Sequence, residues 1–93
     1  MKDINDKYDL EERTFQFAKK VGIFVRSIEK NIVNIEYSKQ LVRSSGSIGA
    51  NYIKANESLS EKDYLLHLRI SRKEAKESIF WLRLVKDINK WVI

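Results

Sequence analysis

The sequence predicts an all-α protein: one domain, built as an antiparallel up-and-down helical bundle with three long helices. Apolar residues recur three or four positions apart through most of the 93 residues, which is the period of an amphipathic helix. Proline is absent, and no segment shows the alternation typical of a strand. The segments between the periodic stretches are short, so consecutive helices are expected to pack antiparallel.

The composition excludes several classes of protein. Hydrophobic residues make up 43% and charged residues 33%, a balance typical of globular domains. Cysteine is absent and His67 is the single histidine, so disulfides, thiolate metal sites and multi-histidine sites are excluded, and neither metal nor cofactor is expected. No apolar run approaches the roughly 20 residues of a membrane span. Residues 1–7 lack signal-peptide character, so we expect a cytoplasmic protein with no membrane partner.

The first helix is expected at about residues 10–29. Asp9 and Glu12 have the spacing of a capping box, so the residues before Asp9 are expected to be frayed. Residues 29–35 form the expected connector, which contains neither glycine nor proline.

The second helix, at about residues 36–57, has an apolar stripe with a small-residue centre. Two glycines and three serines fall close together here, although glycine costs roughly 1 kcal/mol relative to alanine inside a helix. Such a sequence indicates a close helix crossing at Gly49, bordered by a polar seam. The predicted helix-packing motif comprises Arg43, Ser44, Ser47, Ile48, Gly49 and Asn51.

The third helix is expected at about residues 61–88, with Ser60 and Asp63 as its capping box. One apolar stripe, predicted to face the core, contains Tyr64, Leu68, Ser71, Ala75, Ile79 and Leu82. A second apolar face contains Leu66, Ile70, Trp81 and Leu84. Two other helices can cover only part of both faces, so the rest requires a fourth helix or a second subunit. Of these two, we expect an interface between copies of the chain.

A basic face completes the third helix. The chain carries 18 lysines and arginines against 13 acids, a net charge of +5. Within a sector of roughly 100° lie Lys62, Arg69, Arg72, Lys73, Lys76 and Arg83. A row of this kind is the electrostatic footprint expected for a nucleic-acid backbone, whereas the alternative is an ordinary solvated face. Phe80 falls in the same sector. Two roles are expected equally for its ring: stacking on a base, or burial within the protein.

No catalytic constellation is evident. His67 lies at the edge of the apolar stripe, where a packing role is expected. It also lacks the arginine four to six residues earlier that the bundle-shaped HEPN ribonucleases carry. Glu74 and Glu77 have no histidine beside them to form half of a metal site, so Arg43 or Lys54 is the expected partner.

Several short motifs resemble the four helix bundle family, also called the 23S rRNA intervening sequence protein family. They are Arg43-Ser44, Ser47-Ile48, Asn51-Tyr52, Lys62-Asp63, Lys73-Glu74-Ala75 and Trp81-Leu82, within a resemblance that runs from about residue 9 to 84. The family is similar to the accessory protein of diversity-generating retroelements, which implies a homo-pentamer that binds nucleic acid. The chain differs in carrying Lys54 where an acid is usual, and in ending where the family's fourth helix begins.

We therefore expect a non-enzymatic oligomeric protein that binds nucleic acid, RNA before DNA, through the basic face of the third helix. The alternative is a protein–protein scaffold or accessory subunit that never touches nucleic acid. In either case the family's fourth helix is missing or supplied by another chain.

Overall fold

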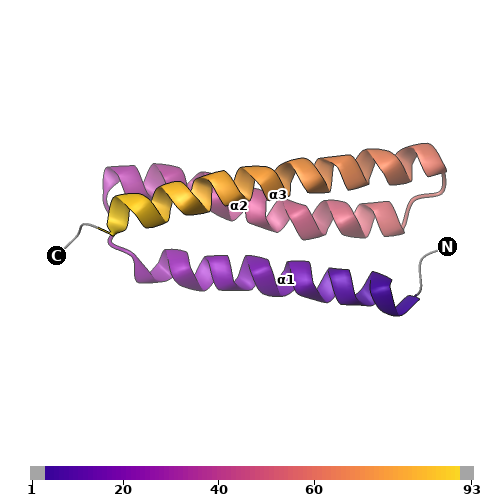
Figure 1. Cartoon of the computed structure of the whole chain (residues 1–93), viewed down its shortest axis with the longest axis horizontal. Helices are drawn as coiled ribbons and strands as arrows, with labels where there is room; N and C mark the ends of the chain where they lie inside the picture. Colours follow the sequence, from indigo (N-terminus) through magenta and orange to yellow (C-terminus); the bar gives the residue numbers. More distant parts are fainter. Residues whose placement is uncertain (1–3, 91–93) are drawn as a thin grey trace.

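The computed structural model describes residues 4–90, with side chains from residue 9 onward, and confirms the all-α prediction. Its helices are α1 (Ile4–Ser27), α2 (Ile32–Asn56) and α3 (Glu61–Asn89). They run antiparallel in an elongated molecule measuring 51 × 22 × 15 Å (Figure 1). Among the described helices, none combines the length and the apolar character needed to cross a membrane.

The predicted start of the first helix is wrong. α1 begins at Ile4, so Asp9 lies inside the helix and is not its cap. Residues 4–10 contain no proline or glycine that would end a helix here. Asp9 instead pairs with Arg13 one turn later, at 3.7 Å on the surface. The helix also ends at Ser27, two residues before the predicted boundary.

The starts of α2 and α3 are both set by side-chain caps. α2 begins at Ile32, four residues earlier than predicted, because the Oδ1 of Asn31 accepts a hydrogen bond from the backbone N–H of Asn34 (2.9 Å). α3 begins at Glu61 as predicted, and the Oγ of Ser60 accepts a bond from the N–H of Asp63 (3.1 Å). The third helix ends at Asn89, one residue beyond its predicted limit.

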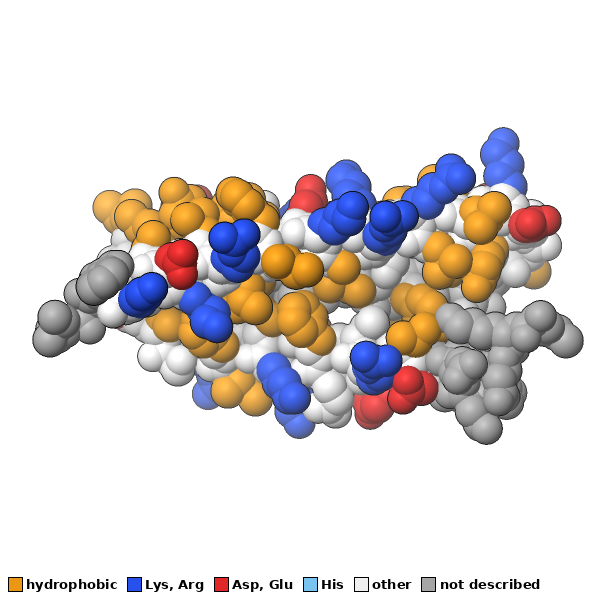
Figure 2. All heavy atoms as spheres, in the orientation of Figure 1, with side chains coloured by type: hydrophobic (Ala, Val, Ile, Leu, Met, Phe, Trp, Pro, Cys, Tyr) orange, Lys and Arg blue, Asp and Glu red, His pale blue; other side chains and the backbone are white. Residues whose placement is uncertain are grey.

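α2 is the central helix, since it packs against both α1 and α3 while these two do not pack against each other. The result is an open trough between α1 and α3. Figure 2 shows apolar side chains along it. A pocket in the trough is lined by Leu10, Arg13, Thr14, Phe17, Ile48, Ala75 and Ile79.

Because of the open trough, the buried side of α3 differs from the core stripe predicted from the sequence. The buried residues of this helix are Ser71, Glu74, Ser78 and Val85. The predicted core stripe is therefore wrong in part: Ser71 is buried, but Ile79 is 59% exposed. The physical reason is that α1 does not reach α3, so this flank of the stripe faces the open trough.

Candidate nucleic-acid interface

The basic row lies on the side of α3 that points away from α2. All six predicted cations are exposed: Lys62, Arg69, Arg72, Lys73, Lys76 and Arg83. The buried positions of the helix, such as Ser78, are about half a turn from the row's centre at Lys76. Figure 2 shows Lys and Arg side chains gathered along α3, above the apolar trough. From Lys62 to Arg83 the row extends about 32 Å at 1.5 Å per residue.

None of these six cations forms an ion pair with another described side chain. The acids Glu74 and Glu77 are directed to α2 instead. There the Arg43 guanidinium lies 3.1 Å from Glu74 Oε2 and 3.6 Å from Glu77 Oε2. Of the two expected partners, Arg43 and Lys54, it is therefore Arg43 that forms the pair. The six cations of the row therefore carry no neutralising ion pair within the described part of the chain.

Phe80 stands among the cations and is exposed. Its side chain is 59% accessible, so the buried alternative is excluded for this chain by itself. The ring meets Trp81 edge to face, with centroids 4.9 Å apart and planes at 79°. Lys76 lies one turn before Phe80 and Arg83 lies three residues after it, so the aromatic face sits between positive charges.

Polar contacts hold α3 firmly on α2 and so fix the direction of the basic row. Ser78 Oγ donates to Ser44 Oγ (2.9 Å) where both side chains are fully buried. Ser71 Oγ donates to the carbonyl of Ile48 (2.8 Å). These short side chains let the two backbones approach closely while the hydroxyls of Ser44, Ser71 and Ser78 each keep a partner.

The rest of the predicted packing motif lies on the same central helix. Gly49 faces α1: a Cβ at this position would lie 2.9 Å from Thr14 Oγ1. Ser47 Oγ donates to the carbonyl of Arg43 on the half-exposed seam. Asn51 donates to the carbonyl of Ser47, and its Oδ1 lies 3.5 Å from His67 Nδ1.

His67 of α3 lies half-buried at the interface with α2, where its ring faces Asn51. Within residues 9–90, no group of three or more histidine, cysteine, aspartate or glutamate side chains is arranged to hold a metal ion.

The sequence analysis did not predict a contact between the N-terminal end of α2 and the C-terminal end of α3. The side-chain amides of Asn34 and Asn89 donate to each other at 2.9 and 2.8 Å. Each also donates to a backbone carbonyl, that of Glu29 and that of Val85 respectively. The two residues are 55 positions apart, so no local spacing signals the pair.

The second apolar face of α3, here called the α3 ridge, consists of Leu66, Ile70, Trp81 and Leu84. Leu66 is 50% exposed, and the other three are half-buried. Tyr37 of α2 covers part of Trp81, with ring centroids 5.8 Å apart. A considerable part of this ridge therefore remains in contact with solvent.

Comparison with known proteins places this geometry in a family. Residues 6–92 match the family described as 23S rRNA-intervening sequence protein. The chain belongs to that family. A crystal structure described as a protein of unknown function from the S23 ribosomal protein family of Bacteroides thetaiotaomicron is similar, with a TM-score of 0.76 and 29% identity. The similarity covers 92% of this chain and 77% of that one. No curated protein matches the chain.

Proposed function

We propose that this member of the 23S rRNA-intervening sequence protein family is a non-enzymatic, oligomeric nucleic-acid-binding protein. RNA is the preferred ligand and the basic row of α3 is the contact surface. The observation that carries the proposal is the separation of charge on α3. Glu74 and Glu77 pair with Arg43 on the side of α2, whereas six exposed cations carry no ion pair among the described residues and only Glu61 and Asp87 dilute their sector.

The surface has the composition expected for binding a phosphate backbone with little sequence preference. Lysine and arginine without neighbouring base-reading amides position a nucleic acid but do not specify its sequence. Phe80 adds an exposed ring between two cations, and stacking on a base tolerates any sequence. RNA is preferred over DNA because the family's description refers to ribosomal RNA.

The proposal includes self-association through the α3 ridge. A half-exposed Leu66 and a partly covered Trp81 on one helix face are costly in water, at roughly 1.5–3 kcal/mol for each large apolar side chain left unburied. A second copy would also repeat the basic row, and linked phosphate contacts reinforce one another.

The test compares two triple variants with equal charge loss. Replacing Arg69, Arg72 and Lys76 by glutamine removes three cations from the row, whereas the matched control replaces Lys19, Lys20 and Arg26 on α1. Fluorescence anisotropy with a labelled single-stranded RNA should show at least tenfold weaker binding for the α3 variant and a small change for the control. Equal loss in both variants would show that only net charge matters.

The second candidate function is the protein–protein scaffold. It is favoured by the exposed apolar side chains on all three helices, among them Phe15, Val42 and Leu66. If the parent protein binds no RNA at low salt, the scaffold becomes the better account.

A further inference from the structure

Phe80 is a large aromatic side chain that the folded chain leaves open to solvent. It is 59% exposed, although an apolar side chain stabilises a fold only to the extent that it leaves water. Its ring touches Trp81 edge to face, with the two planes at 79°. This contact orients the ring of Phe80, while more than half of the residue's surface stays accessible.

The neighbours of Phe80 along α3 are cations on both sides. Lys76 lies one turn before the ring and Arg83 lies three residues after it, and both are exposed. The acid nearest in sequence is Glu77, but its carboxylate is directed to α2, 3.6 Å from the guanidinium of Arg43. The surroundings of the ring on this face of α3 are therefore positive.

The positive charge is not distributed evenly about Phe80. After the ring the row continues only with Arg83, and the exposed Asp87 follows on the same side of the helix. Before the ring, within about 16 Å at 1.5 Å per residue, lie four cations: Arg69, Arg72, Lys73 and Lys76. A strand with one base on Phe80 would therefore meet most of its cations toward the N-terminal end of α3.

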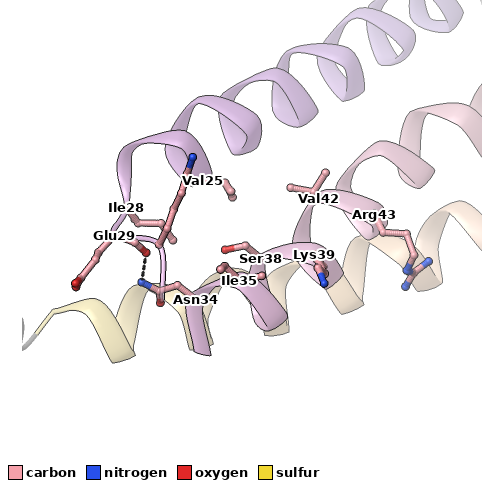
Figure 3. Close-up of a pocket in the computed structure, with 10 residues that line it drawn as sticks. Val25, Ile28, Glu29, Asn34, Ile35, Ser38, Lys39, Val42 and Arg43 are labelled. Carbon is pink, nitrogen blue, oxygen red and sulfur yellow. Dashed lines mark hydrogen bonds between the residues drawn. The ribbon is translucent and has the colours of Figure 1, made fainter. Parts of the chain in front are cut away.

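A second surface combines cations with apolar side chains but lacks a ring. It is a pocket of about 420 Å³ between α1 and α2, whose apolar lining consists of Val25, Ile28, Ile35 and Val42 (Figure 3). Its charged lining includes the acid Glu29, and none of its described lining residues is aromatic. This pocket therefore provides no platform for a base.

We propose that Phe80 stacks on an unpaired base, so that the basic row of α3 binds single-stranded RNA in preference to duplex RNA. The inference rests on the proposed function and adds to it the strand state of the ligand. The ring provides the stacking platform, and the cations on either side hold the phosphates of the strand. Because every base has a π-face, the preference concerns base pairing and not sequence.

Only an unpaired base can offer its face to this ring. Inside a duplex the neighbouring pairs cover both faces of each base, and exposing one costs the energy of unstacking and unpairing. A surface that contacted phosphates alone would bind a duplex at least as tightly as a single strand, because the duplex has the higher charge density. A preference for the single strand therefore has to come from the ring.

The test uses substitutions that leave every charge in place. Phe80→Leu keeps an apolar side chain but removes the aromatic face, whereas Phe80→Trp keeps an aromatic face. Phe15→Leu is the matched control, because Phe15 of α1 is 60% exposed and lies outside the basic row. Circular dichroism and sedimentation velocity should show the parent's helicity and the parent's mass for all three variants.

Fluorescence anisotropy compares a labelled oligouridylate with the same strand annealed to oligoadenylate. The parent should bind the single strand at least tenfold more tightly than the duplex. Phe80→Leu should bind the single strand about tenfold more weakly and the duplex as the parent does, since only the stacking contact is lost. Phe80→Trp should restore the preference, and Phe15→Leu should behave as the parent. The salt slope of Phe80→Leu should equal that of the parent, because no phosphate contact is removed.

A strand of abasic ribose units shows whether the ring and the bases act on each other. It keeps every phosphate but has no base to stack. The parent should bind it about tenfold more weakly than the oligouridylate, whereas Phe80→Leu should bind the two strands equally. The loss of the ring and the loss of the bases should therefore not add, as expected for two groups in direct contact.

Three results would overturn the inference. If the parent binds the duplex as tightly as the single strand, Phe80 does not select unpaired bases, and the proposed RNA binding stands without it. If Phe80→Leu weakens both ligands equally, or lowers the mass in sedimentation, the ring has a structural or interfacial role instead. If the parent binds neither ligand at low salt, the inference fails together with the RNA binding on which it rests.

Discussion

At the scale of single residues, small side chains decide how closely these helices approach. Ser44 and Ser78 share a buried hydrogen bond between α2 and α3, and Gly49 leaves just enough space for Thr14 between α2 and α1. Larger residues at these points would separate the backbones and open the few buried apolar contacts that hold the chain together.

Gly49→Leu should lower the free energy of unfolding by about 1–3 kcal/mol through overpacking against Thr14. Ala50→Leu is the matched control, because Ala50 is the exposed neighbour and leucine is a good helix former. Chemical denaturation followed by circular dichroism measures both. A Gly49→Leu protein as stable as the control would contradict the close crossing.

Local spacing predicts some of these residue-scale features and misses others. Ser60 could be recognised as a cap because its partner is three residues away. Asn31 has the same spacing to Asn34, but the apolar run that follows concealed the start of the helix. The Asn34–Asn89 pair could not be predicted, since it exists only after two helices have packed.

At the scale of elements, the Arg43 bridge links α2 to the acidic side of α3. Glu74 is only 6% exposed, so its carboxylate depends on this partner. The charges in the sequence reduced the expected partners to Arg43 and Lys54, and only the packed helices show that Arg43 forms the pair. The spacing along α3 could not, however, show that α1 lies away from it, so the core stripe was misplaced at Ile79.

Arg43→Gln should destabilise the fold by about 1–3 kcal/mol, because it leaves a buried acceptor without a charged partner. Arg43→Lys should restore only part of the loss, since one ammonium cannot reach two carboxylates in the forked geometry of a guanidinium. Thermal unfolding measures both. Full rescue by lysine would show that charge alone, not the bridging geometry, holds the helices.

At the scale of the whole molecule, the chain is elongated and has few buried apolar residues. In the described part these are Val21, Leu41, Tyr52, Ala55 and Val85. The three-helix arrangement could be predicted from the sequence. The open surroundings of Gly22 and Gly46 could not, because they exist only after the helices have packed.

Light scattering at micromolar concentration should give a mass above the 11.0 kDa of one chain. Trp81→Ala should weaken the association at least tenfold, since interfacial tryptophans often carry much of the binding energy. The substitution also removes the Tyr37 contact within the chain. Circular dichroism of the same sample should show parental helicity, so that the weaker association reports on the interface and not on unfolding. A parent mass of 11.0 kDa at every concentration tested would contradict the assembly.

The salt dependence of RNA binding tests the central claim most directly. Six cations that meet phosphates of a single strand release counterions, so the logarithm of affinity should fall against the logarithm of salt with a slope of about −4, at roughly −0.7 per contact. The variant lacking Arg69, Arg72 and Lys76 should have a slope near −2. A parent that binds RNA with the same slope as this variant would show that the basic row of α3 is solvated and does not contact phosphates.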